Sequence, residues 1–361
     1  MQLANINKII HIVGNRPQFV KLAVLHKALA TLTNVTQQIV HTGQHFSEQM
    51  SGIFFDDLAI PTPNINLQIN NTTANHFIGA ATEALQQYLI NQPNSIVMVY
   101  GDTNTTLAAS IAAKKVGLPL FHFEAGVRTF DMQMPEEINR VIADRLADVN
   151  YCCTTLNNTT LHKEGFGQAI KNEVIITGDL MLDAFLKIPA HDTAITNYDK
   201  YVVATIHRAA NLSSALYLSE IITALNQIHL QIPVVLPIHP HTQQKINEFG
   251  LQPQFDVIPA LGYPQMKRLL KDATYVITDS GGTCREAYFL QKQSLIIMDK
   301  VFWPEIIAEG AALQTGAQTN EIISNFEKLP HIGASFNAAI FGDGTAAEKI
   351  TAHIAQYIAT H

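Results

Sequence analysis

Short apolar runs alternate with amphipathic stretches along most of the chain, and this alternation restricts the fold more than any other feature. In the first half, strands are predicted at residues 9–13, 38–41, 96–100, 118–123 and 174–176, and helices at 17–29, 47–58, 76–90 and 105–116. Parallel strands need long crossovers, which are usually helical, so the alternation predicts a doubly wound parallel α/β sheet.

The same pattern restarts after a polar, turn-rich segment at 189–201, which we interpret as part of an interdomain linker. Strands are then predicted at 201–206, 233–237, 256–258, 275–278 and 294–298, and helices at 215–230, 263–271 and 281–290. We therefore expect two Rossmann-like domains, residues 1–185 and 186–345, with a ligand-binding cleft between them. The last helix, within 346–361, is expected to pack back on the first domain.

The composition of the 361-residue chain is that of an ordinary globular protein, with 47% hydrophobic and 15% charged residues. Its formal net charge of −7 argues against nucleic acid as a partner, because phosphate binding needs a basic face. No apolar run approaches the roughly 20 residues that span a bilayer, and the polar N-terminus is too short for a signal peptide. Cys152 and Cys153 are adjacent, which predicts buried free thiols, and we expect a cytoplasmic protein without membrane association.

Ligands of such sheets lie at the carboxyl ends of the strands, where the first half of the chain carries several charged residues. The stretch GNRPQFVK, after the first strand, supplies Arg16 and, about one helical turn beyond it, Lys21. Pro17 suits the first turn of a helix at this point. The alternative is a capped helix with a surface lysine. We take Arg16 and Lys21 as candidate ligand-binding residues.

Two acidic residues follow later strands of the first half. Asp102 comes after strand 96–100 in GDTNTT, and Glu124 directly follows strand 118–123. If the two strands are neighbours, both carboxylates face one cleft and form a plausible general acid/base set. Asp102 could instead cap a helix, and either acid could be paired structurally with Arg128 or Arg140. GDTNTT lacks the phosphate-loop spacing, so nucleoside triphosphate chemistry is not indicated.

A helix is predicted to begin at Pro135, and it carries charges at helical spacing. Glu136, Arg140 and Asp144 are four residues apart, which predicts a ladder of stabilising ion pairs along the helix. Glu136 and Glu137 directly after the proline also fit the positive end of a helix. This explains the order of the charges, but it does not explain why Glu124 stands at a strand end.

The second half offers an anion-binding turn and scattered histidines. In TDSGGTCREA, Ser280, Gly281 and Gly282 join a strand to a helix, so backbone N–H groups can approach an anion at the helix N-terminus. Glu286, one turn into that helix, could accept hydrogen bonds from ribose hydroxyls; the alternative is a tight strand–helix turn. His207 and His239 end neighbouring strands, but with His241 they are too sparse to predict a metal site.

Together these stretches resemble the non-hydrolysing UDP-N-acetylglucosamine 2-epimerase family. The resemblance spans most of the chain and rests, in the family's order, on GNRPQFVK, TGQH, YGDTNTT, FHFEAGVRTF, MPEEINR, GDLMLDA, TIHR, HPHT and TDSGG with EA beyond it. It implies a GT-B fold, two Rossmann-like domains with the sugar nucleotide between them. It also implies an isomerase that inverts C2 of a UDP-N-acetylamino sugar without NAD or a metal ion, by eliminating UDP to a 2-acetamidoglucal and adding it back.

The resemblance also assigns roles by position. Asp102, Glu124 and Glu136 match the acid/base carboxylates. His207 is a further catalytic candidate, which like Arg16 and Lys21 matches a group near the sugar and diphosphate. The nucleotide-binding turn and the ribose contact match Ser280, Gly281, Gly282 and Glu286. No cofactor, a homodimer and a place in making surface-polysaccharide precursors are implied in the same way.

Two stretches depart from the commonest family pattern. MDKVFWPEI is one residue shorter, with Trp303 where the family has an arginine, and after Arg208 the pair Ala209-Ala210 precedes Asn211 without the family's glutamate. RPQF, HTGQH and the tryptophan are closer to the branch that acts on UDP-2,3-diacetamido-sugar uronic acids. A hydrolysing 2-epimerase, a GT-B glycosyltransferase and a non-catalytic nucleotide-sugar-binding protein are the alternatives.

Overall fold

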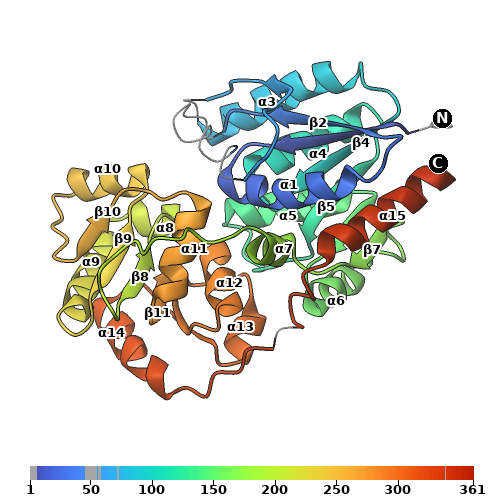
Figure 1. Cartoon of the computed structure of the whole chain (residues 1–361). Coiled ribbons are helices and arrows are strands. Elements are labelled where there is room, and N and C mark those ends of the chain that lie inside the picture. The colour runs from blue at the N-terminus through green and yellow to red at the C-terminus, as the bar shows by residue number, and fades with distance from the viewer. Residues whose placement is uncertain (1–5, 45–54, 56–57, 71–72, 338) are drawn as a thin grey trace. The chain divides into compact units, whose positions relative to one another are not determined.

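Two separate sheets of parallel strands organise the chain, one in each of two units (Figure 1). The computed structural model describes residues 6–44, 55, 58–70, 73–337 and 339–361. Contacts within the chain divide it into Met1–Lys187 with Ala339–His361, called unit 1 here, and Ile188–Ala338, called unit 2. Both units alternate strands with helices, which confirms the α/β class predicted from the sequence.

The sheet of unit 1 has the strand order β3-β2-β1-β4-β5-β6-β7 among the described residues. Every neighbouring pair is parallel. The strands are β1 (Lys8–Val13), β2 (Thr36–His41), β3 (Ile65–Asn66), β4 (Ser95–Tyr100), β5 (Leu120–Ala125), β6 (Val149–Cys152) and β7 (Glu173–Ile176). All six residues of β4 are buried, as expected for a central strand covered on both faces.

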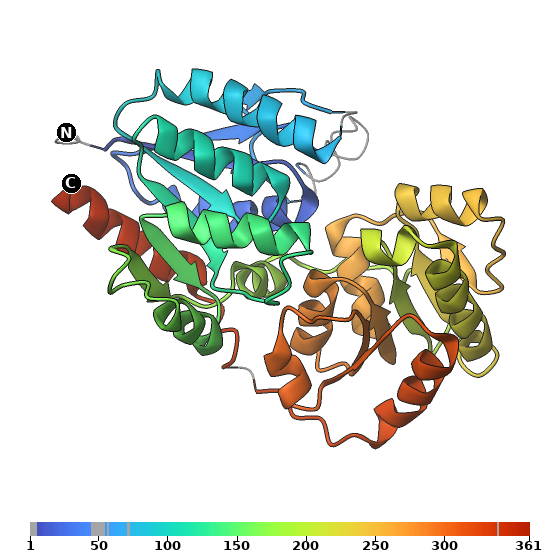
Figure 2. The same ribbon diagram turned by 180° about the vertical axis from the view of Figure 1, so that it is seen from behind.

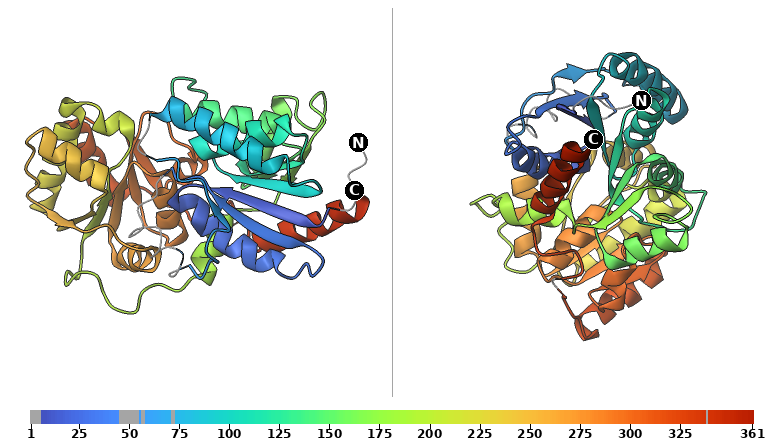
Figure 3. Two further views of the ribbon diagram at one scale, coloured as in Figure 1. Left: turned by 90° about the horizontal axis from the view of Figure 1, so that it is seen from above. Right: turned by 90° about the vertical axis from the view of Figure 1, so that its right-hand side faces the viewer.

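Two groups of helices cover the sheet of unit 1. Helices α3 (Ala74–Leu89), α4 (Asn104–Lys115) and α5 (Pro135–Leu146) lie side by side (Figure 2). The other face carries α1 (Arg16–Leu29), α7 (Leu180–Lys187) and the last helix, α15 (Ala346–Thr360), which lies against α1 (Figure 3). Helix α6 (Thr155–Lys163) connects β6 to β7.

One buried carboxylate fixes the start of α15. Asp183, in the fragment GDLMLDA, accepts hydrogen bonds from the backbone N–H groups of Ala346 and Ala347 at 3.0 and 2.8 Å. Burial raises the pKa of Asp183, and these N–H groups counteract the shift. The carboxylate thereby satisfies donors that the first turn of a helix leaves unpaired.

The sheet of unit 2 has the order β10-β9-β8-β11-β12-β13, and all its neighbours are parallel. Its strands are β8 (Val202–Thr205), β9 (Val234–Pro237), β10 (Asp256–Ile258), β11 (Tyr275–Thr278), β12 (Ser294–Ile297) and β13 (Ala312–Thr315). Its helices are α8 (Ala209–Leu212), α9 (Ala215–His229), α10 (Pro240–Glu248), α11 (Tyr263–Asp272), α12 (Gly281–Phe289), α13 (Pro304–Ala308), α14 (Thr319–Lys328) and the 3-10 turn Leu329–His331.

Two hydrophobic clusters form the core of unit 2. One joins the sheet to α9 and α14, and the other joins it to α11 and α12. No range was predicted for strands β3, β6 and β13 or for helices α6, α7, α8, α10, α13 and α14, while the helix expected at 47–58 lies, except for Phe55 and Leu58, outside the described residues. Among the helices that the structure describes, none is long and apolar enough to cross a membrane.

Candidate active site

Asp102 and Glu124 follow two strands that are neighbours in the sheet. Strands β4 and β5 pair in parallel, with Tyr100 opposite Phe123. The two strands are therefore neighbours, which the sequence had left open. Parallel strands end at the same edge, so the two carboxylates stand at the edge where such sheets bind ligands.

Glu124 does not end its strand, contrary to the sequence-based expectation. Strand β5 continues to Ala125, and its register with β6 shifts between Phe123 and Ala125, which marks Glu124 as the extra residue of a β-bulge. Its φ is +69°, in the left-handed region that side chains other than glycine rarely adopt. Such a conformation costs on the order of 1 kcal/mol or more and must be held by its surroundings. The bulge changes the direction in which the Glu124 carboxylate points.

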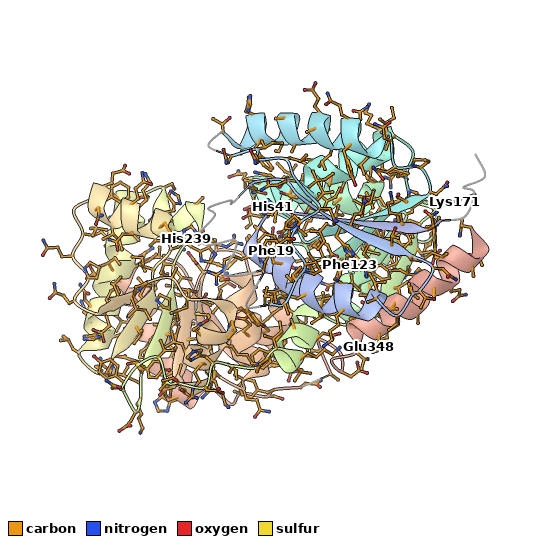
Figure 4. The ribbon with its side chains drawn as sticks, turned by 45° about the horizontal axis from the view of Figure 1, so that its top comes forward. Phe19, His41, Phe123, Lys171, His239 and Glu348 are labelled. Carbon is orange, nitrogen blue, oxygen red and sulfur yellow. The ribbon has the colours of Figure 1, made fainter. Side chains whose placement is uncertain are left out.

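The partner of Glu124 is Lys21 of α1, whose ammonium forms an ion pair with Glu124 Oε2. The side chains are only 4% and 13% exposed, so the charges compensate each other largely out of water. Phe19, two residues earlier on α1, stacks on His41 of β2 with ring centroids 5.4 Å apart (Figure 4). This packing helps to hold α1 and thus Lys21 in place.

Lys21 and Glu124 line a small pocket that is formed entirely by unit 1. Its other walls come from the ends of β5, β6 and β7, and from α15: Phe123, Tyr151, Cys153, Thr177, Gly178, Asp179, Leu180 and Ile350. Glu124, Cys153 and Asp179 present oxygen and sulfur atoms within 4.8 Å of one another, a donor set that could hold a metal ion. The Lys21 ammonium already supplies a positive charge to Glu124, so the cluster does not need a metal to balance that charge.

Asp102 also faces a buried cation. Its Oδ2 forms an ion pair with Arg140 of α5, and its backbone carbonyl accepts a hydrogen bond from Asn139 Nδ2 at 2.9 Å. The Asp102 side chain is 27% exposed, whereas that of Arg140 is 2% exposed. Helix α5 thus holds the Asp102 loop by two neighbouring side chains and leaves one edge of the carboxylate accessible.

The charge ladder predicted along α5 is wrong. Arg140 pairs with Asp102 and, at 2.7 Å, with Glu137, rather than with Glu136 or Asp144. Asp144 pairs with Arg128 and His122. The reason is that the face of α5 that carries Arg140 and Asp144 is buried, so long-range partners replace those along the helix.

The adjacent residues Glu136 and Glu137 have different environments. Glu137 is 1% exposed and accepts hydrogen bonds from the backbone N–H groups of Thr129 and Phe130 at 3.0 and 2.9 Å. It therefore anchors the loop that follows β5. Glu136 is half-buried in the first turn of α5, and no side-chain partner for it is found among the described residues.

Arg16 begins α1, but the residue that ties this end of the helix to the sheet was missed in the sequence analysis. Gln18 accepts a hydrogen bond from Gly14 N at 2.7 Å and donates to the carbonyl of Tyr100 at 2.9 Å. It thereby joins the ends of β1 and β4. The only available signal was its place inside GNRPQFVK, because a buried glutamine cannot be told from an exposed one by spacing.

In unit 2, the candidate residues gather around a carboxylate that was also missed, Asp279. Asp279 is fully buried and accepts hydrogen bonds from the backbone N–H groups of His207 and Arg208 at 3.0 and 2.9 Å, and its Oδ1 lies 3.2 Å from His207 Nδ1. The His207 side chain is 43% exposed. Its ring lies 6.4 Å from that of His239, which is the N-cap of α10 (Figure 4).

The predicted anion-binding turn forms the start of α12. Ser280 caps the helix and accepts a hydrogen bond from the backbone N–H of Thr283 at 3.3 Å. A side chain at Gly281 would meet the ring of Phe302 at 2.7 Å, whereas one at Gly282 would have only an ordinary contact of 3.7 Å with Ser280 Oγ. Packing against Phe302 thus explains why residue 281 is a glycine. At Gly282 the lack of a side chain leaves open space at the turn. Glu286 lies one turn further on and is 8% exposed.

The stretch MDKVFWPEI, which departs from the commonest family pattern, contributes two aromatic rings, and an arginine side chain stacks on each of them. Trp303 is 1% exposed, and the guanidinium of Arg285 lies 4.3 Å from its ring centroid. The guanidinium of Arg208 lies 4.4 Å from the ring centroid of Phe302, and its Nε donates to the carbonyl of Asp279 at 2.8 Å. These stacks hold two cations beside the Ser280 turn, so Trp303 is part of the core that supports it.

Comparison with known proteins gives one consistent result. Residues 27–355 match the family model described as UDP-N-acetylglucosamine 2-epimerase. The UDP-2,3-diacetamido-2,3-dideoxy-D-glucuronate 2-epimerase of Pseudomonas aeruginosa is 36% identical over 353 residues, which cover 97% of this chain and 99% of that protein.

Solved structures agree over nearly the whole chain. The UDP-GlcNAc 2-epimerase of Methanocaldococcus jannaschii, crystallised with UDP-GlcNAc and UDP, matches with a TM-score of 0.89 and 32% identity, covering 97% of this chain and 99% of that one. The S. aureus MnaA–UDP structure matches with a TM-score of 0.86 and 27% identity, covering 98% and 97%. These matches, together with the two parallel sheets, confirm the GT-B fold expected from the sequence.

Proposed function

The chain belongs to the UDP-N-acetylglucosamine 2-epimerase family, a class of isomerases, and on this premise we propose that it inverts C2 of a UDP-linked 2-acetamido sugar and keeps UDP attached in the product. The observation that carries the proposal is the pairing of β4 with β5, which sets Asp102 and Glu124 at adjacent strand ends, each against a buried cation. An epimerase must remove a proton from one face of a carbon and deliver a proton to the opposite face. Two carboxylates from neighbouring strands suit that task.

The proposed chemistry proceeds through elimination. The C2 proton is not next to a carbonyl group and is poorly acidic, so direct deprotonation is difficult. A carboxylate removes this proton while the C1–O bond to UDP breaks, which gives a 2-acetamidoglucal and UDP. The reverse addition, with a proton delivered to the opposite face of C2 and UDP returned to C1, completes the inversion.

Asp102 and Glu124 are the proposed bases. Each forms an ion pair with a buried cation, Arg140 and Lys21 respectively. Glu136, half-buried at the start of α5, is the third carboxylate of the proposal. Arg16 is assigned to substrate binding. In unit 2, we assign the departing UDP to the Ser280–Gly282 turn, where backbone N–H groups begin α12, with His207 beside it and Glu286 toward the ribose.

The sugar is the open part of the proposal. The Pseudomonas aeruginosa relative is named for a diacetamido-glucuronate, and the Methanocaldococcus jannaschii relative for UDP-GlcNAc. We propose a UDP-2-acetamido sugar of this group, a homodimeric enzyme and a place in making surface-polysaccharide precursors; family membership supports all three.

The test is NMR of the purified protein in D2O with UDP-GlcNAc and, in parallel, UDP-2,3-diacetamido-2,3-dideoxy-glucuronate. Deuterium at C2 of an intact UDP-sugar, together with the C2 epimer, is the expected result. UDP and free epimerised sugar would replace the proposal by a hydrolysing epimerase. Transfer of the sugar only when an acceptor is added would indicate a glycosyltransferase, and binding of both nucleotides without exchange at C2 would indicate a binding protein.

A further inference from the structure

A fully buried histidine, His122, stands on β5 two residues before Glu124 and contacts an oxygen atom through each ring nitrogen. Nε2 lies 2.7 Å from the backbone carbonyl oxygen of Gly101, and Nδ1 lies 2.7 Å from Asp144 Oδ1. A carbonyl oxygen can only accept, so Nε2 carries a proton. The state of the ring therefore depends on which side of the Nδ1–Asp144 contact holds the second proton.

The surroundings of Asp144 favour its ionised form. Asp144 is fully buried, and its Oδ2 accepts hydrogen bonds from the guanidinium of Arg128 at 2.6 Å and from the backbone N–H of Gly126 at 3.2 Å. Burial alone would raise the pKa of Asp144, but the hydrogen bond from His122 and the charge of Arg128 outweigh it and lower the pKa below the usual 3.8. Asp144 Oδ2 already accepts from two donors, so the geometry makes Asp144 the acceptor and His122 Nδ1 the donor in the contact at Oδ1.

The neighbouring charges support this assignment. Arg128 also forms paired hydrogen bonds with the carboxylate of Glu164 on α6, at 2.9 Å each. Glu164, Arg128, Asp144 and His122 thus contact one another in this order. Their charges alternate in sign when His122 carries two protons, so the buried charges compensate one another. On β6, Asn150 lies opposite His122 and donates a hydrogen bond to the Asp144 backbone carbonyl. Cys152 of the same strand adds no charge, because burial raises the pKa of its thiol.

This cluster reaches the backbone next to both proposed bases. His122 holds the carbonyl of Gly101, the residue before Asp102, and Gly101 has a φ of +61°. Asp144 holds the N–H of Gly126, two residues beyond Glu124 and the bulge. We infer that His122 donates hydrogen bonds from both ring nitrogens and acts, with Asp144, as a positioning residue that fixes the geometry of Asp102 and Glu124 together. The catalytic part of this inference rests on the proposed function.

The two donor contacts of His122 can be tested on the wild-type protein without any substrate. The measurement is nitrogen-15 NMR of histidine-labelled full-length protein, in which a nitrogen that carries a proton and one that does not have different shifts. The His122 signal is assigned by its loss in His122→Gln. We expect both ring nitrogens to show the shift of protonated nitrogen, and one bare ring nitrogen would overturn the inference.

The positioning role is tested by kinetics. A displacement of about 1 Å can cost on the order of 100-fold in rate, so His122→Gln and Asp144→Asn should lower kcat by about that factor while KM stays within about 3-fold. The matched control is His353→Gln on α15, because His353 also bonds through both ring nitrogens, to Tyr151 and Glu173, without touching either strand-end loop. A kcat within about 3-fold of wild type in folded His122→Gln would overturn the positioning role. Inactive wild-type protein would refute the proposed function instead and leave the NMR result standing.

Discussion

Lys21 and Glu124 form a largely buried ion pair although 103 residues separate them in the chain. Lys21 comes from the first helix, and Glu124 comes from a bulge of the fifth strand. The pair explains how a glutamate can stand at a mostly buried strand end: a fixed cation offsets the loss of hydration. It also places a carboxylate and its cation side by side in the wall of a pocket.

Removing Lys21 should leave the charge of Glu124 without this cation. We expect Lys21→Met to lower the free energy of unfolding by about 3 kcal/mol. Chemical denaturation checks the value, with Lys27→Met as the control, because Lys27 is an exposed lysine on the same helix. The double variant Lys21→Met/Glu124→Gln should recover part of the loss, since the buried glutamine carries no charge. Equal stability of Lys21→Met and Lys27→Met would contradict the structural role of the pair.

The adjacent glutamates of α5 should respond in opposite ways. Glu137→Gln should cost about 2–3 kcal/mol of stability, because charge-assisted hydrogen bonds to the Thr129 and Phe130 amides and to Arg140 are weakened. Glu136→Gln should change stability by less than about 0.5 kcal/mol and lower kcat by about 100-fold or more. Each variant is the control for the other in paired denaturation and turnover measurements. Full turnover in Glu136→Gln would remove this residue from the proposed acid/base set.

Asp102→Asn should separate binding from chemistry. An asparagine keeps the shape of the side chain but cannot accept a proton, so kcat should fall by about 1000-fold. Arg140 retains its ion pair with Glu137, so the fold should persist, and calorimetry should show UDP binding within about 3-fold of wild type. Epimerisation at the wild-type rate would show that Asp102 is not a base.

Trp303 should be a stability residue of unit 2. It is the only tryptophan in the chain and is 1% exposed, so its fluorescence should shift to longer wavelength when unit 2 unfolds. Trp303→Ala should cost about 4 kcal/mol, from lost burial and from the lost contact with Arg285. Far-UV circular dichroism during denaturation measures the cost. Leu230→Ala, at a residue 85% exposed, is the control and should have almost no effect.

Asp144 should contribute to the loss of stability in acid. Its pKa in the folded protein lies below 3.8, so its stabilisation is present above the unfolded value and is lost as the pH falls through the folded value. Asp144→Asn should therefore lose stability less steeply below about pH 4. Asp183 has the opposite sign, because burial raises its pKa: its contribution is present below the unfolded value of 3.8 and is lost as the pH rises through the folded value, which lies above 3.8. Asp183→Asn should lose stability more steeply in acid, and equal slopes in the two variants would contradict both assignments.

The sequence predicted most of the architecture because the signals for it are local. The buried run of β4 and the restart of the strand–helix pattern after 189–201 need only residues close together in the chain. The neighbouring positions of Asp102 and Glu124 were one possibility within the same pattern, since consecutive strands of such sheets are often neighbours. Gln18 and Asp279 were missed, because burial of a polar side chain depends on what packs above it.

Sequence by itself determined the fold class and the types of residue that stand near the carboxyl ends of the strands. Only the tertiary structure decided the partners. Spacing along α5 favoured Glu136 as the partner of Arg140 and left Asp102 as an alternative, and packing of that helix decided for Asp102. Likewise, the left-handed φ of Glu124 lies at a bulge in the pairing of β5 with β6, which the sequence did not indicate. Periodicity records which face of an element is buried, but a charge pairs with whatever the neighbouring elements bring to that face, and this depends on contacts between distant parts of the chain.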